Sequence, residues 1–258
     1  MIRLGTIVNS PSAAADTRPR ERESVVAGAV SAVTSRQHAS RTMTEEAIRT
    51  LRSNLLLRTA SGMHSFVFVS ARPAEGKSTI AANLATSLAA LQKRVLLIDA
   101  DLRKPVMHRL FQLSNAHGLA DVLRGTRSAA DTWQATGRGP TLLAAGSPPE
   151  DPQALFESEQ FGRLMTDVRG QFDLVLVDSA PLLAVADTTL IVPHIDAAVL
   201  VARYGAVSEN EAASAVERLR SAGGKVIGCV LSQVTEIDDA FHAYAREYIK
   251  PGVPREQS

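Results

Sequence analysis

The stretch Ser65–Leu91 reads SFVFVS-ARPAEGKST-IAANLATSLAAL. It opens with a β-branched and aromatic run typical of a buried strand, and it closes with apolar residues at helical spacing. The segment between them matches the spacing of a phosphate-binding loop, G-x-x-x-x-G-K-[ST], except that Ala71 replaces the first glycine. A strand before this loop and a helix after it are the context that the motif requires.

The loop has the groups that bind phosphate. Successive backbone N–H groups form an anion nest, and the next helix adds the positive end of its dipole. Gly76 allows close approach, Lys77 supplies a charge, and Ser78 offers a hydroxyl to Mg²⁺. We predict a nucleotide site formed by Ala74, Glu75, Gly76, Lys77, Ser78 and Thr79.

Aliphatic runs alternate with helical patterns along most of the chain. Strands are predicted at 65–70, 94–99, 141–145, 173–178, 197–202 and 225–231. Helices are predicted at 44–58, 77–92, 158–169, 184–194 and 208–222, with short ones near 107–113 and 118–124. Near-continuous apolar strands separated by helices indicate a parallel sheet covered on both faces. The predicted fold class is α/β, a three-layer, doubly wound, mostly parallel sheet of the P-loop NTPase type.

Acidic residues end two of these strands. Asp99 and Asp101 lie in LLIDADLRKP, and Asp178 ends the strand within LVLVDSAP. Ligands of open α/β sheets bind at the carboxyl ends of the strands. A single aspartate at such a place is often only a turn or helix cap. Three of them beside a phosphate-binding loop favour a magnesium site that includes Asp178.

Composition limits the classes of function. The 258 residues hold 28 Lys plus Arg against 27 Asp plus Glu, a balance that argues against a dedicated nucleic-acid binder. The single cysteine, Cys229, excludes an internal disulfide framework. No apolar run reaches the 18 or so residues of a membrane span, so we expect a cytoplasmic chain. Residues 10–42 are rich in Ser, Ala, Thr and Arg, and residues 1–42 are predicted to form a flexible N-terminal tail.

The segments ARPAEGKS, IDADLRKP and VDSAP together resemble the bacterial tyrosine kinases, or BY-kinases. These are cytoplasmic kinases of capsule and exopolysaccharide systems, related in fold to the MinD/ParA group. The resemblance implies a P-loop kinase domain over 43–235 and an ATP-dependent tyrosine autokinase, with ATP and Mg²⁺ as cofactors, that regulates polysaccharide polymerisation and export. The alternative is a MinD/ParA-like ATPase switch without kinase activity.

The resemblance also implies residue roles. Lys77 and a Mg²⁺ ion held by Ser78, Asp99 and Asp178 would neutralise charge on the transferred phosphoryl group. Asp101 or Asp99 would orient a tyrosine hydroxyl and take its proton, and the sequence leaves both open. The predicted catalytic residues are therefore Lys77, Asp99 and Asp101. Arg103 is predicted either to anchor its own loop or to meet the acceptor segment.

Two further motifs concern assembly and substrate. Glu46, Arg49 and Arg52 share one helical stripe and resemble the family's oligomerisation motif, which implies a homo-oligomeric ring. The alternative is an internal Glu–Arg pair on a solvated face. The C-terminal tail, 236–258, carries Tyr244 and Tyr248 as predicted phosphoacceptors; alternatively they are part of the apolar face of a terminal helix.

Partners follow from the same resemblance. We expect a separate membrane activator, a chain-length regulator, to hold the chain at the inner face of the membrane. No nucleic-acid partner is expected. Three positions depart from the family pattern: Ala74 replaces a glycine of PGEGKS, Asp151 stands where the family often has an asparagine, and Ser232 stands where an asparagine near the adenine is usual.

Overall fold

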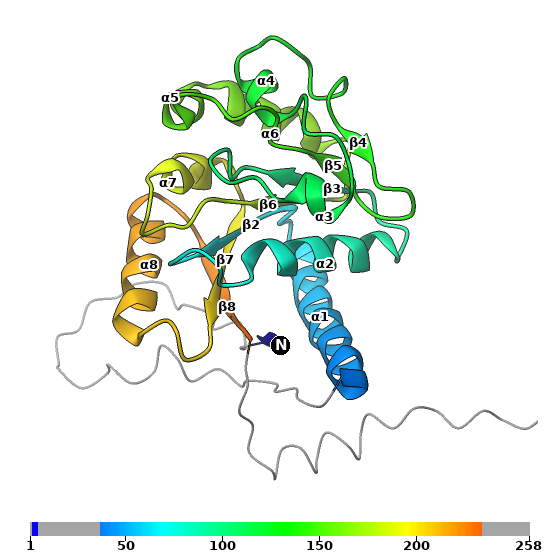
Figure 1. Cartoon of the computed structure of the whole chain (residues 1–258), viewed down its shortest axis with the longest axis vertical. Coiled ribbons are helices and arrows are strands. Elements are labelled where there is room, and N and C mark those ends of the chain that lie inside the picture. The colour runs from blue at the N-terminus through cyan, green and yellow to red at the C-terminus, as the bar shows by residue number, and fades with distance from the viewer. Residues whose placement is uncertain (1, 5–36, 234–258) are drawn as a thin grey trace, which may run out of the picture.

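The protein is built around one eight-stranded sheet, seen in a computed structural model that describes residues 2–4 and 37–233 (Figure 1). The strand order is β1-β8-β7-β2-β6-β3-β5-β4. The strands are β1 (Ile2–Leu4), β2 (Ser65–Ser70), β3 (Val95–Asp99), β4 (Gln134–Ala135), β5 (Thr141–Leu143), β6 (Leu174–Asp178), β7 (Ala197–Arg203) and β8 (Val226–Ser232). Only the two edge strands, β1 and β4, pair antiparallel. The predicted mostly parallel sheet is confirmed.

Helices cover both faces of this sheet. One face carries α1 (Gln37–Ala60), α2 (Lys77–Ala89) and α3 (Met107–Leu110). The other carries α4 (Leu119–Leu123), α5 (Pro152–Glu157), α6 (Gln160–Arg169), α7 (Asp187–Ile191) and α8 (Glu209–Ser221), with a short 3₁₀ turn, η1 (Val192–His194), after α7. The three-layer architecture is therefore confirmed.

Strand β2 shows how one segment serves two cores. Phe66 and Phe68 pack with α1 and α2, whereas Val67 and Val69 pack with the helices of the opposite face. Successive side chains of a strand point to opposite faces, so a strand between two helical layers must be apolar throughout. All six residues of β2 are buried.

Some elements differ from the sequence predictions. Strands β1 and β4 and helix α5 were not predicted, and α1 begins at Gln37 rather than near Thr44. Strand β1 lies in the range predicted to be a tail. It has only three residues, and it pairs with β8, which is distant in the chain. The local sequence pattern therefore does not predict it. The rest of the predicted N-terminal tail up to residue 36, and the C-terminal tail, lie outside the described residues.

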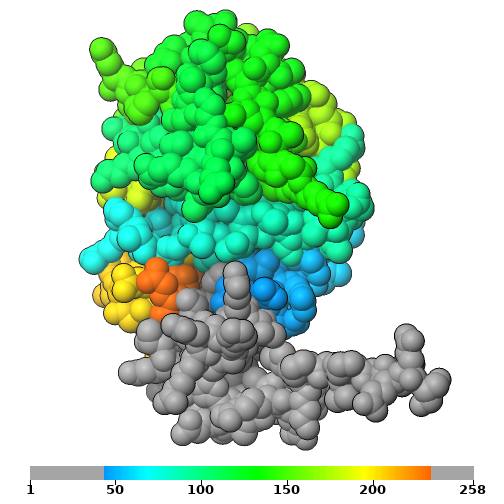
Figure 2. All heavy atoms as spheres, turned by 45° about the vertical axis from the view of Figure 1, so that its right-hand side comes forward, coloured from blue at the N-terminus to red at the C-terminus, as the bar shows by residue number. Residues whose placement is uncertain are grey.

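The topology gathers the candidate residues at one end of the sheet. Strands β2, β6 and β3 are adjacent, and Asp99 is paired in register with Asp178. In the space-filling view (Figure 2), the middle of the chain forms one half of the molecule, and α1 and the end of β8 lie in the other. The phosphate-binding loop leaves β2 at the centre of the sheet, between these halves.

Candidate active site

The phosphate-binding loop joins β2 to α2 with a bent backbone. Ala74 and Gly76 have φ angles of 62° and 84°, both in the left-handed region, and Gly76 is the N-cap of α2. Ser70 Oγ donates to the Arg72 carbonyl at 3.0 Å, and the Arg72 amide donates to Glu75 Oε1 at 2.8 Å. These bonds brace the loop from within.

A cleft of about 630 Å³ opens over this loop. All six predicted cofactor-binding residues, 74–79, line it. The loop after β3 contributes Asp101 and Lys104, α3 contributes Arg109, and the segment after β6 contributes apolar wall residues such as Pro181. The volume is within the range of small-molecule sites, and the cationic side chains suit an anionic ligand.

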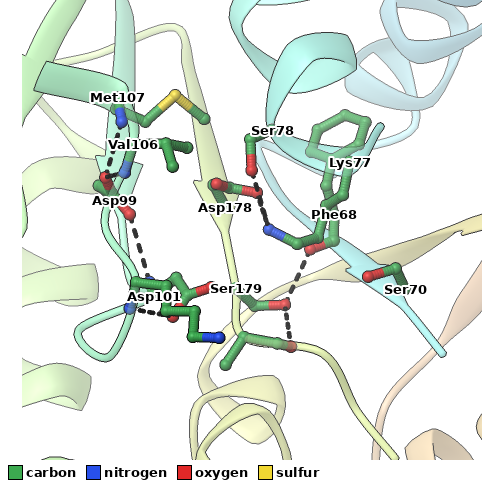
Figure 3. Close-up of polar contacts among 12 residues, drawn as sticks. Phe68, Ser70, Lys77, Ser78, Asp99, Asp101, Val106, Met107, Asp178 and Ser179 are labelled. Carbon is green, nitrogen blue, oxygen red and sulfur yellow. Dashed lines mark hydrogen bonds and ion pairs between the residues drawn. The ribbon is translucent and has the colours of Figure 1, made fainter. Parts of the chain in front are cut away.

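A buried ion pair lies beneath the cleft (Figure 3). Lys77 and Ser78, at the start of α2, face Asp178 at the end of β6, and Lys77 Nζ pairs with Asp178 Oδ1. Lys77 is 6% exposed and Asp178 is fully buried. Asp178 Oδ2 is buried without a hydrogen-bond partner. Because a buried charge is costly unless it is paired, this oxygen is suited to a cation.

Asp99 lies beside Asp178 in the neighbouring strand. Its Oδ2 accepts hydrogen bonds from the amides of Val106 at 3.0 Å and Met107 at 2.9 Å. Burial first, and the charge of Asp178 second, raise the pKa of Asp99 to about 7. Two carboxylates in adjacent strand positions repel each other, which favours either a proton or a metal ion between them.

Of the three aspartates predicted for the site, Asp101 is the one that lines the cleft. It is 9% exposed, and its Oδ1 accepts from the Lys104 amide at 3.0 Å. Burial is the main cause of a raised pKa at Asp101. Arg103 lies in the same loop and makes a two-fold ion pair with Asp187, with Nε–Oδ2 at 2.7 Å and Nη2–Oδ1 at 2.9 Å. Of the two roles left open for Arg103, this contact supports anchoring of the loop.

The residues present fit a magnesium ion bound together with phosphate. Ser78 Oγ lies 3.3 Å from Lys77 Nζ, and Figure 3 shows Ser78, Lys77 and Asp178 facing one another. Asp178 keeps one oxygen without a partner. Within residues 37–233, no cluster of three or more His, Cys, Asp or Glu side chains is placed to hold a metal by itself. Mg²⁺ is typically bound by one or two carboxylates plus substrate phosphates, which is the set that this site offers.

One buried acid of the site, Asp187, was not predicted from the sequence; it is 1% exposed and holds Arg103. Glu75, a predicted nucleotide-site residue, is 3% exposed and keeps one carboxylate oxygen without a partner. Burial is the main cause of a raised pKa at Glu75. An acid within the otherwise apolar run LLAVAD was the available signal for Asp187. Ser232, which stands where the family usually has an asparagine near the adenine, donates its hydroxyl to the carbonyl of Glu75.

The predicted oligomerisation residues lie on α1. Arg49 Nη1 and Glu46 Oε2 are 3.1 Å apart on an exposed face, and Arg52 Nη1 donates to Ser87 Oγ of α2 at 3.0 Å. Both contacts are internal to the chain, and an exposed pair of this kind contributes only a few tenths of a kcal/mol. The role of these residues in assembly stays a prediction, and Tyr244 and Tyr248 lie outside the described residues.

Comparisons with known proteins agree with this geometry. Residues 66–243 match the CobQ/CobB/MinD/ParA nucleotide binding domain. The chain is 37% identical to tyrosine-protein kinase YwqD of Bacillus subtilis over 74% of its own length and 82% of that protein. It is 34% identical to tyrosine-protein kinase wzc of Salmonella typhimurium, over 77% of its own length but only 28% of the relative.

Among solved structures, the kinase domain of Escherichia coli tyrosine kinase ETK superposes with a TM-score of 0.73 at 31% identity, covering 76% of this chain and 77% of that one. None of the helices that the structure describes is both long and apolar enough to cross a bilayer. The chain thus belongs to the CobQ/CobB/MinD/ParA family of nucleotide-binding domains and, within it, to the bacterial tyrosine-protein kinases.

Proposed function

We propose that this chain is an ATP-dependent protein-tyrosine autokinase that regulates capsular or exopolysaccharide polymerisation and export. One observation carries the proposal: the phosphate-binding loop and Asp101 line one cleft, Lys77 of that loop pairs with the buried Asp178, and Asp99 lies in register beside Asp178. Membership of the tyrosine-protein kinases supports the reaction type.

The residues of the cleft would divide the work of phosphoryl transfer. The amides of the loop and Lys77 would bind the phosphates of ATP, and Ser78, Asp99 and Asp178 would hold Mg²⁺. Bound Mg²⁺ would offset the negative charge of the transferring phosphoryl group. Asp178 also keeps Lys77 from turning away from the loop, because the two side chains are paired in a water-poor setting.

Asp101 is the better placed of the two candidate bases. Asp99 is fully buried, and both of its oxygens already accept backbone amides, whereas Asp101 lines the cleft and has one oxygen outside the Lys104 bond. Its pKa is raised toward the range in which a carboxylate accepts a proton efficiently. We therefore assign to Asp101 the orientation and deprotonation of the acceptor tyrosine.

The test is the intact mass of the purified chain after incubation with ATP and Mg²⁺, followed by mapping of the modified residues. Phosphate on Tyr244 or Tyr248 is expected. Lys77→Met should reduce the rate by about 100-fold or more, because the charge beside the phosphates is lost. Lys93→Met, at an exposed lysine after α2, is the matched control and should behave as wild type. Phosphotyrosine formed equally by Lys77→Met would refute the proposal.

One observation favours a second function. The chain has only three tyrosines, and a nucleotide-gated switch of the MinD/ParA type needs none. The test is ATP hydrolysis by the double variant Tyr244→Phe/Tyr248→Phe. If its rate is unchanged and no phosphoprotein forms, the chain is an ATPase switch and the kinase proposal is wrong.

Assembly and location are part of the proposal. The proposal includes a separate membrane activator that holds this chain at the inner face of the membrane, as the resemblance to the bacterial tyrosine kinases implies. The match covers only 28% of the relative wzc. Arg49, which is 57% exposed, is the residue best placed to reach a neighbouring subunit in a ring. Light scattering should show that Arg49→Glu lowers the oligomer mass, and an unchanged mass would exclude this contact.

A further inference from the structure

We propose that Ser232 and Gln233, at the end of β8, hold the phosphate-binding loop in its nucleotide-binding shape. Ser232 Oγ donates to the carbonyl of Glu75, and Gln233 Nε2 donates to the carbonyl of Ala74 at 3.3 Å. These are consecutive carbonyls of the loop. The inference rests on nucleotide binding in the proposed function and does not require phosphate transfer to tyrosine.

The carbonyls of the phosphate-binding loop need hydrogen-bond donors on the side that faces away from the phosphate. In an anion nest the backbone N–H groups turn toward the phosphate, so the carbonyls of the same residues point away from it. A carbonyl that is shielded from water and has no donor is costly. Ser232 supplies such a donor to the carbonyl of Glu75 in a buried contact, and Gln233 adds a donor at the exposed carbonyl of Ala74. Ser70 does the same for the carbonyl of Arg72 from the start of the loop.

The loop is also strained where these donors act. Ala74 has a φ of 62°, a left-handed conformation that is unfavourable for a residue with a Cβ atom. Such a conformation persists only where the surroundings impose it. The hydrogen bond from Gln233 ends on the carbonyl of this residue, and the bond from Ser232 ends on the next.

The end of β8 is a firm support. Ser232 is 2% exposed and pairs in register with Arg203 of β7, and its carbonyl accepts from the Tyr204 amide at 3.0 Å. Contact with the loop is close, since a Cβ added to Gly76 would lie 3.3 Å from Ser232 Oγ. Gln233 is the last described residue before the segment that carries Tyr244, so the support and the predicted acceptor segment are neighbours in the chain.

The expected signature is a loss of affinity without a loss of turnover. When the hydroxyl of Ser232 is removed, the loop relaxes from its strained shape, and only a fraction of molecules is ready to bind. Apparent affinity falls by that fraction, about tenfold for one lost buried hydrogen bond. Bound nucleotide restores the shape, so kcat stays within about twofold of the wild-type value.

The experiment measures ADP affinity by calorimetry, with and without Mg²⁺, for wild type, Ser232→Ala, Ser232→Thr and Gln233→Leu. Ser232→Ala and Gln233→Leu should each weaken binding, and Ser232→Thr, which keeps a hydroxyl, should bind ADP more tightly than Ser232→Ala. Thr132→Val is the matched control, since it removes a buried hydroxyl that donates to the carbonyls of Ser128 and Ala129 away from the loop. It should lose stability but keep its ADP affinity.

Wild-type affinity in both Ser232→Ala and Gln233→Leu would overturn the inference, as would an equal loss in Thr132→Val. If the chain binds ADP but forms no phosphotyrosine, the kinase proposal is refuted and this inference is not affected. Coupling is reciprocal, so ADP should slow hydrogen exchange at the Tyr204 amide in wild type and less so in Ser232→Ala. If ADP slows exchange at this amide equally in wild type and Ser232→Ala, the proposed role of Ser232 in holding the loop is contradicted.

Discussion

Replacing Asp99 by asparagine should make the protein more stable at pH 8 relative to wild type, although it removes a predicted catalytic residue. The pKa of Asp99 is raised from 3.8 to about 7, so the folded state holds a proton that the unfolded state has released between these values. Stability contributed by this proton is complete below pH 3.8 and is lost as the pH rises to about 7. Asparagine is always neutral, and its carbonyl oxygen can accept from Val106 and Met107 as the carboxylate does.

The size of the effect follows from the pKa. Between pH 5 and pH 7, wild type loses about 1.4 kcal/mol per pH unit relative to Asp99→Asn, or about 3 kcal/mol in total. The measurement is the free energy of unfolding from urea titrations at pH 5 and pH 8. Asp173→Asn is the control, because Arg94 lowers the pKa of Asp173, and its effect should be the same at both pH values. If the difference between Asp99→Asn and wild type does not change with pH, the pKa of Asp99 is not raised by its burial and the charge of Asp178.

Three other changes test separate parts of the structure. Ala74→Gly should raise the free energy of unfolding by up to about 1 kcal/mol, because glycine adopts the left-handed conformation of this position without strain. Ala213→Gly in α8 is the control and should lower the free energy of unfolding by about 1 kcal/mol. If urea titrations show a loss of stability in both variants, Ala74 is not strained. Asp187→Asn should lower kcat about 10- to 100-fold with little change in ADP affinity, since it frees Arg103 and loosens the loop that carries the proposed base, and wild-type kcat would show that the pair is not needed. Burial raises the pKa of Cys229 from 9.0 to about 11, so alkylation of the native thiol at pH 8 should be about 100-fold slower than in urea; equal rates would mean that the thiol is not shielded.

Local pattern was sufficient for the central part of the fold. Strand β2, the phosphate-binding loop and the start of α2 were predicted within a residue, because apolar periodicity and motif spacing lie within one short stretch of chain. The meeting of Asp99 with Asp178 also followed from the sequence, since parallel strands place their carboxyl ends at one edge of the sheet.

Contacts between distant segments were beyond the reach of local pattern. Arg103 and Asp187 are 84 residues apart in the chain, and Ser232 and Glu75 are 157 apart. Which donor meets which acceptor depends on strand order and on the path of each loop, and neither leaves a periodic signal in the residues themselves. The sequence determined the chemistry that is available, namely a lysine, hydroxyls and carboxylates at strand ends. Packing alone determined which of these groups are buried, which are paired, and therefore which have shifted pKa values, because desolvation and pairing exist only in the folded chain.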